Sequence, residues 1–176
     1  MTDRYTSESA AEHRQKSPGK VGCAVITVSD TRTLENDKSG QAVVNSLESA
    51  GHTIVERAIV PDEPKKIHEL VVRLVDSKDV EAILLTGGTG IAPRDQTPET
   101  LEKLITKNLP GYGELLRMLS YEEIGPAAML SRALGGLIGQ TLVLTMPGST
   151  AAVRLTMEKL ILPELGHLVT QGQGEQ

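Results

Sequence analysis

The chain has 176 residues and a formal net charge of −5, and 39% of its residues are hydrophobic. This length suits one domain, and since three tyrosines are its only aromatic residues, the core must be aliphatic and there are few rings on which bases of a single strand could stack. The acidic balance and the lack of a Lys/Arg block predict that the protein binds neither nucleic acid nor an anionic membrane.

The two ends of the chain are expected to lie outside the packed domain. Residues 1–18 are polar and show no period, which predicts a mobile N-terminal tail, and residues 169–176 are read as a C-terminal tail. One domain, 19–168, remains between them. No apolar run reaches the roughly 18 residues that span a bilayer, and the N-terminus has no apolar core like that of a signal peptide. With Cys23 as the single cysteine, a cytoplasmic location is expected.

Strand and helix patterns alternate along the first half of the domain. The apolar runs at 21–29 and 82–86 are typical of strands that are covered on both faces, and 53–60 is predicted as a further strand. A helix is expected from about 39 to 50, with Gly51 at its C-terminal end. Two more are expected: an amphipathic helix that includes Ile67, Leu70, Val71, Leu74 and Val75, and a helix at about 98–107.

The second half is less regular. A helix should begin near Gly111–Glu114, and a short one is predicted at 127–134. The segments 134–138 and 141–146 read as a β-hairpin, and 149–165 as the final helix. The whole pattern predicts an α/β fold, with a mostly parallel sheet sandwiched between helices and a short antiparallel element. The loops that leave the parallel strands should converge on one edge of the sheet, where such folds bind ligands.

The segment Thr86–Glu99 carries the strongest functional signal. Its glycines permit φ > 0, and successive free N–H groups in such a turn bind anions. Thr97 is the expected N-cap of the helix that follows, with Pro98 and Glu99 in its first turn. Phosphate donors, a cation and a carboxylate at a helix start predict a phosphorylated ligand and a metal. The candidate binding residues here are Thr86, Gly87, Gly88, Thr89, Gly90, Arg94, Thr97 and Glu99.

The same segment disagrees with two common nucleotide motifs. It is not a Walker A loop, because no Gly-Lys-Ser/Thr follows. It is also a poor dinucleotide fingerprint, because Pro93 stands where the third glycine would be. A nicotinamide-dependent dehydrogenase, which the alternating pattern would otherwise suit, is therefore disfavoured.

Asp62, in the turn Pro61–Pro64, is a second candidate site. By itself this is an ordinary polar turn with a capping carboxylate. However, Asp62 follows a predicted strand and should reach the same sheet edge as Asp95. Two carboxylates beside a phosphate-binding loop repel the ligand unless a cation lies between them, so the pair predicts Mg²⁺ held by Asp62 and Asp95.

Two further loops are candidates, although ordinary loop and cap chemistry explains each as well. Ser29–Arg32 follows the first strand, and Asp37–Gly40 enters the first helix. Pro147–Ser149 exposes the N–H groups of another helix start. Pattern alone cannot place Ser131–Arg132, and the histidines show no spacing typical of a metal site. The candidate binding residues in these loops are Ser29, Asp30, Pro147, Gly148 and Ser149.

Taken in order, these motifs resemble the MoaB/Mog family of molybdenum cofactor biosynthesis, whose molybdopterin-binding domain also occurs in gephyrin-type proteins. The resemblance covers roughly residues 20–165, and its sequence around 26–40 is more similar to the MoaB branch. The matching segments are Thr27–Arg32, Asp37–Gly40, Val60–Glu63, Thr86–Gly90, Asp95–Glu99, Leu130–Ala133 and Met146–Ser149.

The resemblance implies a molybdopterin adenylyltransferase, in which the terminal phosphate of molybdopterin attacks the α-phosphorus of Mg-ATP. It implies Asp62 and Asp95 as the catalytic pair, and it adds Ser131 to the substrate-binding residues. Because Asp62, Arg94 and Asp95 are all present, an active enzyme is expected. Homotrimers or homohexamers, and other molybdenum-cofactor biosynthesis proteins as partners, are also implied. The alternative is a non-catalytic molybdopterin-binding or scaffold protein of the same family.

Overall fold

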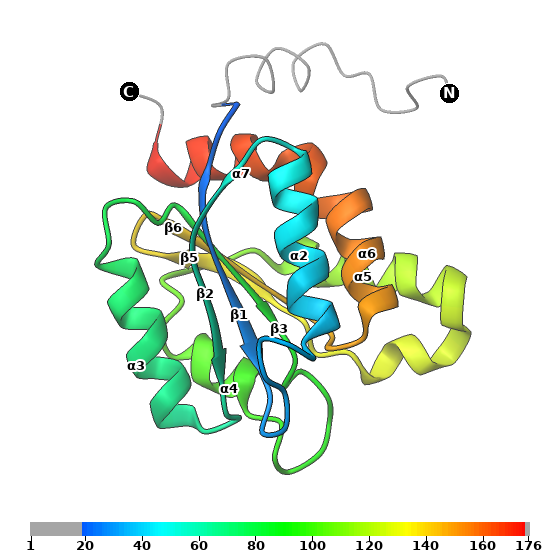
Figure 1. Ribbon diagram of the computed structural model, residues 1–176. Coiled ribbons are helices and arrows are strands. Elements are labelled where there is room, and N and C mark those ends of the chain that lie inside the picture. Colours follow the sequence, from blue (N-terminus) through cyan, green and yellow to red (C-terminus); the bar gives the residue numbers. More distant parts are fainter. Residues whose placement is uncertain (1–18, 175–176) are drawn as a thin grey trace, which may run out of the picture.

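A mixed sheet lies between two layers of helices in the computed structural model, which describes residues 19–174 (Figure 1). The strand order is β2-β1-β3-β6-β5-β4, in which β2, β1, β3 and β6 are parallel and the last two strands are antiparallel to their neighbours. The predicted fold class, with its hairpin, is confirmed. The strands are β1 (Gly22–Val28), β2 (Thr53–Val60), β3 (Ala82–Thr86), β4 (Lys107–Asn108), β5 (Gly135–Ile138) and β6 (Thr141–Met146).

Helices connect the parallel strands and cover both faces of the sheet (Figure 1). The segment after α5 is a 3₁₀-helix, and a π-helical turn joins α6 to α7. The predicted N-terminal tail lies outside the described residues, within which no helix is long and apolar enough to cross a membrane. The helices are α2 (Lys38–Ser49), α3 (Pro64–Val75), α4 (Thr97–Glu102), α5 (Pro110–Ile124), η1 (Gly125–Leu130), α6 (Thr150–Thr156), η2 (Met157–Ile161) and α7 (Leu162–Gln173).

Two aliphatic cores form because alternate residues of each central strand point to opposite faces. In β1, Cys23 and Val25 belong to the core under α2, α6 and α7, whereas Ile26 belongs to the core under α3 and α4. Burial raises the pKa of the Cys23 thiol to about 12. Cys23 is therefore a neutral packing residue.

Three predicted boundaries are wrong. Helix α4 ends at Glu102 rather than near 107, because Lys107–Asn108 pairs with β5 as an edge strand. The short helix predicted at 127–134 is the 3₁₀-helix η1. The predicted C-terminal tail begins too early, since α7 continues to Gln173 and Val169 on it is fully buried.

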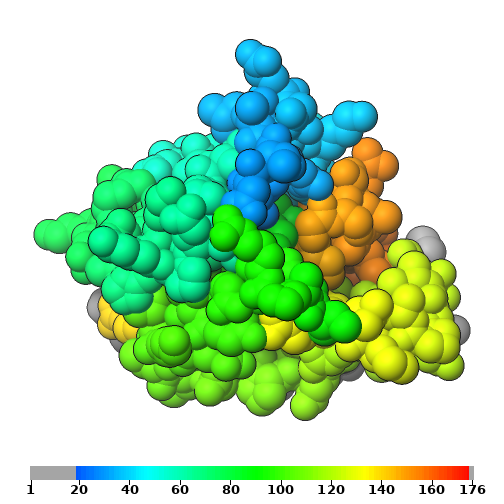
Figure 2. Space-filling view, turned by 90° about the horizontal axis from the view of Figure 1, so that it is seen from below, coloured from blue at the N-terminus to red at the C-terminus, as the bar shows by residue number. Residues whose placement is uncertain are grey.

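The connections place a crevice at the carboxyl ends of β1 and β3. After β1 the chain turns to α2 on one face of the sheet, and after β3 it turns to α4 on the other. Adjacent parallel strands whose connections diverge in this way form the ligand crevice of open α/β sheets. Figure 2 looks onto this edge, where the loop after β1 (blue), the loop after β3 (green) and the start of α6 (orange) lie beside one another.

Candidate functional site

The loop after β3 has a backbone that other residue types would not readily adopt. Gly87 and Gly88 have φ values of 99° and 64°, in the left-handed region that favours glycine. A Cβ on Gly87 would lie 2.3 Å from the carbonyl oxygen of Val28. The Gly87 N–H donates to the Met146 carbonyl (3.1 Å), and the Thr86 hydroxyl donates to that of Pro147 (3.1 Å). The loop is thereby tied to the ends of β1 and β6.

The next N–H groups of this loop remain available to a ligand. Within residues 19–174, those of Gly88, Thr89, Gly90 and Ile91 donate to no protein acceptor, whereas the Ala92 N–H donates to Asp95 Oδ2 (3.0 Å). Consecutive unpaired N–H groups in a glycine turn form a concavity that binds anions. The run of unpaired N–H groups expected of this glycine loop is therefore present.

Asp62 is buried against this loop. Its side chain is 6% exposed, Oδ1 accepts the Gln96 N–H (3.1 Å), and Oδ2 lies 2.6 Å from where a Cβ on Gly88 would be. Burial raises the pKa of Asp62 above its ordinary value, and the charges of Asp95 and Asp30 add to this, against the hydrogen bond from Gln96. Asp62 does not cap α3, because Glu63 occupies the N-cap position.

Asp95 lies on the same loop. Its Oδ2 accepts the Ala92 N–H (3.0 Å) and is 2.6 Å from the position of a Cβ on Gly90. Since Asp62 packs on Gly88 and Asp95 packs on Gly90, two glycines separated by one residue bring both carboxylates to one segment of backbone. The sequence expectation that these carboxylates share a sheet edge is supported by this geometry.

An ion pair joins the loop after β1 to the glycine loop. Arg94 donates two hydrogen bonds to the Asp30 carboxylate, from Nε (2.8 Å) and from Nη2 (2.7 Å). The hydrogen bond from Arg94 lowers the pKa of Asp30 below its ordinary value. Asp30 Oδ1 also accepts the Asp62 N–H (3.2 Å). Three of the connecting loops are therefore linked through Asp30.

Asp37 organises the other side of the crevice. It caps α2 by accepting the Gly40 N–H (3.0 Å), and it also accepts the Thr27 hydroxyl (2.7 Å) and pairs with Arg32 and Arg57 (both 3.3 Å). Burial would raise the pKa of Asp37, but these hydrogen bonds outweigh it and hold that pKa below its ordinary value. Arg32 also donates to the Gly148 carbonyl (3.0 Å), which connects the loops after β1 and β6.

The remaining predicted binding residues are distributed around this crevice. Ser29 Oγ accepts the N–H groups of Thr31 and Arg32, so it shapes its own loop. Ser149 caps α6 by accepting the Ala152 N–H (3.2 Å). Ser131 ends η1, with its Oγ 3.5 Å from the Ala133 N–H. These three hydroxyls already take part in local hydrogen bonds.

The expected cap at Thr97 is wrong. Gln96 is the N-cap residue of α4, and Thr97 is the first residue of the helix. Thr97 is fully buried, and its hydroxyl is one of three buried side-chain atoms without a partner in the described chain. That hydroxyl lies 2.2 Å from the position of a Cβ on Gly88, which places it beside Asp62.

Arg132 was not predicted as a site residue, although it donates three hydrogen bonds to the segment 89–95. Its backbone N–H donates to Thr89, Nε donates to Gly90 (2.8 Å) and Nη2 donates to the Asp95 carbonyl (2.8 Å). Nη1 pairs with Glu99, whose pKa this hydrogen bond lowers. The Ser131–Arg132 pair was a visible sequence signal, but no local pattern shows which distant carbonyls it meets.

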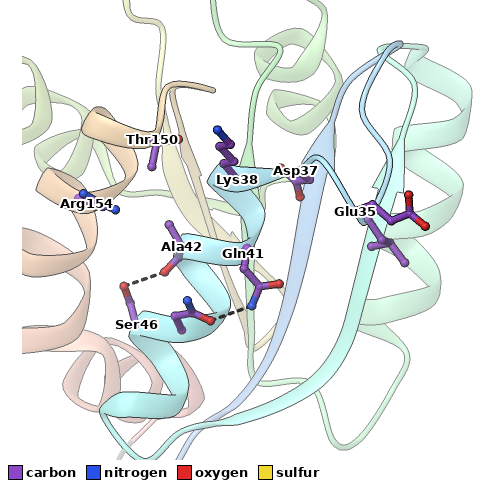
Figure 3. A pocket seen from close by; sticks show the side chains of 10 residues that line it. Glu35, Asp37, Lys38, Gln41, Ala42, Ser46, Thr150 and Arg154 are labelled. Carbon is purple, nitrogen blue, oxygen red and sulfur yellow. Dashed lines mark hydrogen bonds between the residues drawn. The ribbon is translucent and has the colours of Figure 1, made fainter.

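A pocket of about 450 Å³ opens between α2 and α6 beside this crevice (Figure 3). Asp37 and Lys38 line it from the start of α2, and Thr150 and Arg154 line it from α6. Some of its lining residues therefore lie in or next to two of the predicted loops, Asp37–Gly40 and Pro147–Ser149.

No group of three or more His, Cys, Asp or Glu side chains that could hold a metal ion occurs within residues 19–174. A magnesium ion bound through one or two carboxylates obtains its other ligands from water and from substrate phosphates. The pair Asp62 and Asp95 fits a magnesium ion that is held in this way, and it does not fit a metal site made entirely of protein ligands.

Sequence comparison places this arrangement among known proteins. The family described as "Probable molybdopterin binding domain" matches residues 24–167. The molybdenum cofactor biosynthesis protein B of Bacillus anthracis is 51% identical over 161 residues, which are 91% of this chain and 95% of that protein. The Bacillus subtilis protein of the same name is 51% identical over 164 residues, covering 93% and 96% of the two chains.

Solved structures agree with the sequence relatives. A crystal structure of molybdenum cofactor biosynthesis protein B is similar with a TM-score of 0.86 and 49% identity, over 89% of this chain and 98% of the other. The tungsten cofactor synthesizing protein MoaB of Pyrococcus furiosus is similar with a TM-score of 0.78 and 35% identity, over 90% and 100% of the two chains. The fold is therefore shared across these proteins.

Proposed function

The chain belongs to the molybdopterin-binding domain family of molybdenum cofactor biosynthesis, and from that premise we propose that it is a molybdopterin adenylyltransferase. A terminal phosphate oxygen of molybdopterin attacks the α-phosphorus of ATP. The bond between the α-phosphorus and the bridging oxygen to the β-phosphate breaks, and pyrophosphate leaves. Adenylylated molybdopterin is the second product.

The observation that carries this proposal is the position of two acidic side chains on one glycine turn. Asp62 packs on Gly88 and Asp95 packs on Gly90, around N–H groups that have no protein acceptor within residues 19–174. Carboxylates beside an anion-binding backbone are unfavourable in a simple phosphate site. They are useful where a cation accompanies the phosphates, as in nucleotidyl transfer.

The residues present fit Mg²⁺ that arrives with the nucleotide. Asp62 and Asp95 would hold it, and it would neutralise charge on the phosphates during transfer. The raised pKa of Asp62, caused by burial and by the neighbouring carboxylates, supports this, because a cation relieves the same excess of negative charge. The N–H groups of Gln96 and Ala92 hold the carboxylates of Asp62 and Asp95 in place. The glycine turn would donate its free N–H groups to phosphate oxygens.

Positioning accounts for the remaining chemistry. Adenylyl transfer needs little from the protein beyond alignment and charge neutralisation, and no nucleophilic side chain is required. The fixed loops supply alignment: Arg94 binds Asp30, and Arg32 connects Asp37 to Gly148. Several loops that are linked at one edge of the sheet suit a substrate that carries both a pterin and a phosphate.

We also propose that the protein acts as a homo-oligomer, a homotrimer or a homohexamer, in the cytoplasm. An exposed apolar stripe supports self-association: Met118 and Tyr121 on α5 are 54% and 61% exposed. Met129 on η1 is 73% exposed and lines the same surface hollow. Contiguous apolar surface of this kind is typical of an interface between proteins. Other molybdenum-cofactor biosynthesis proteins would supply molybdopterin and take up the product.

The Asp95→Asn substitution tests the proposal. Asparagine keeps the size of the side chain and can still accept the Ala92 N–H, but it removes the charge that would hold Mg²⁺. We expect turnover with molybdopterin and Mg-ATP to fall at least about 100-fold while molybdopterin affinity changes little. Lys65→Gln, an exposed substitution on α3, is the control. Full turnover by Asp95→Asn would refute the assigned role.

A further inference from the structure

Arg132 joins the glycine loop to the start of α4. Its backbone N–H donates to the Thr89 carbonyl (3.1 Å), and its side chain donates to the carbonyls of Gly90 (2.8 Å) and Asp95 (2.8 Å). The third side-chain nitrogen, Nη1, pairs with the Glu99 carboxylate. One residue therefore holds both ends of the segment between Thr89 and Asp95, and anchors it to the first turn of the helix.

The chemistry of this contact needs a guanidinium group. Three different nitrogens point to three acceptors that lie in different parts of the loop, and a planar fork with fixed N–H directions reaches them together. A lysine ammonium is a point charge that could satisfy one or two of these acceptors but not the same three. The contact is therefore specific to arginine.

Arg132 acts on Asp95 without occupying its carboxylate. The hydrogen bond from Nη2 goes to the backbone carbonyl of Asp95, whereas the side-chain Oδ2 accepts the Ala92 N–H. Holding the backbone fixes where the carboxylate is presented and leaves its charge available. The Asp95 carbonyl and the N–H of Gln96, which donates to Asp62 Oδ1, belong to the same peptide unit. By holding this unit, Arg132 fixes the backbone that connects the two carboxylates.

We infer that Arg132, with Glu99, is a positioning residue for catalysis: it sets Asp95 and the free N–H groups of the glycine loop in the geometry that transfer requires. This inference rests on the adenylyltransferase proposed above. Glu99 accordingly serves the loop through Arg132 and is assigned no direct contact with substrate. A misplacement of about 1 Å at such a site costs roughly 100-fold in rate.

Kinetics of the full-length Arg132→Ala and Arg132→Lys variants test the inference. We expect kcat to fall about 100-fold for the alanine variant and at least about tenfold for the lysine variant, with KM for Mg-ATP within about threefold of wild type. Glu99→Gln should lie between wild type and Arg132→Lys. A kcat within threefold of wild type for both Arg132 variants would overturn the inference.

Hydrogen exchange separates this inference from the function on which it rests, because it needs no turnover. In the Arg132 variants, the hydrogen-bonded amides within residues 89–96, those of Ala92, Asp95 and Gln96, should exchange faster than in wild type while those of β1, β3 and β6 remain unchanged. The matched control is Arg73→Ala, which removes an Arg–Glu pair (Arg73–Glu56, 2.6 Å) on the outer surface of α3 and β2, and should alter neither kcat nor exchange at 89–96. Unchanged exchange at 89–96 in both Arg132 variants would overturn the positioning role, whatever the wild-type chain catalyses.

Discussion

Gly88 shows how one residue can determine the shape of the site. It combines a φ of 64° with a position where a Cβ would lie 2.2 Å from Thr97 Oγ1 and 2.6 Å from Asp62 Oδ2. The positive φ would strain any other residue type. The short distance to Asp62 leaves no room for a side chain at this position.

The two features can be separated with alanine substitutions. Gly88→Ala should lose turnover at least about 100-fold, because the new methyl group displaces Asp62. Gly139 has nearly the same φ, 60°, but nothing lies within 4 Å of its Cβ position. Gly139→Ala should therefore lose about 1 kcal/mol of stability and keep its turnover. Steady-state kinetics and thermal melts of the pair would show this; equal turnover in the two variants would mean that contact with Asp62 is not required.

The buried charge of Asp62 lowers the free energy of unfolding at neutral pH. Its pKa is raised, chiefly by burial, so between the ordinary and the raised value the folded chain holds a proton that the unfolded chain has released. The free energy of unfolding therefore falls as pH rises through that window, and the full penalty remains above it.

The Asp62→Asn variant should be inactive and yet more stable than wild type at neutral pH. Asparagine can still accept the Gln96 N–H but carries no charge. Melting temperatures would show a higher value for the variant at pH 7, and the difference should disappear below the ordinary carboxyl pKa of about 3.9. A lower melting temperature for Asp62→Asn at pH 7 would contradict the assignment of Asp62 as a strained, buried carboxylate.

At the scale of elements, the start of α2 depends on Asp37. This side chain is 2% exposed and holds together β1, the loop after it, α2 and β2 through Thr27, Arg32, Gly40 and Arg57. Removing it takes away a helix cap and deprives Arg32 and Arg57 of their carboxylate partner. Breaking a buried pair of this kind typically costs about 3 kcal/mol.

Asp37→Ala should lower the melting temperature by roughly 10 °C at about 2–4 °C per kcal/mol. Ser149→Ala, at a cap with one hydrogen bond of 3.2 Å, should cost only about 1 kcal/mol. Because the pKa of Asp37 is lowered in the folded state, its contribution is complete above the ordinary carboxyl pKa and is lost as pH falls through the lowered value. A gap between wild type and Asp37→Ala that widens in acid would contradict this.

Sequence periodicity was sufficient to predict the central strands and one of the helices that cover them. The apolar runs of β1 and β3 and the spacing of apolar residues in α3 are local patterns, so the bounds of both strands and the presence of the helix could be predicted. The edge strand β4 could not be, because two exposed residues, Lys107 and Asn108, are extended only through their pairing with β5. The end of α7 was missed because burial of Val169 against the sheet is a tertiary effect.

The same division holds for the site. Parallel strands bring their loops to one edge, and this alone was enough to place Asp62 near Asp95. The contacts of Arg132 and Arg32 could not be predicted. Arg132 donates to Gly90, 42 positions away, and Arg32 donates to Gly148, 116 positions away. The acceptors in both cases are backbone carbonyls, which leave no signature in the sequence.

For the whole molecule, the apolar stripe on α5 stands out on the surface of a chain whose net charge is −5. Met118→Lys should weaken self-association, because it puts a charge in the middle of the stripe. Sedimentation should show wild type as an oligomer and the variant shifted toward monomer. The control is Val55→Lys, which likewise replaces an apolar side chain with a charged one, at a 38% exposed position on β2. A wild-type monomer would contradict the oligomer proposal.

The crevice as a whole is proposed to join molybdopterin to the adenylyl group of ATP, and label transfer tests this most directly. The full-length chain would be incubated with molybdopterin, Mg²⁺ and ATP labelled at its α-phosphate. The account predicts labelled adenylyl-molybdopterin and one pyrophosphate for each molecule formed, with both lost when Mg²⁺ is withheld. Tight binding of molybdopterin without any transfer of label would contradict it and would leave a binding or scaffold protein in its place.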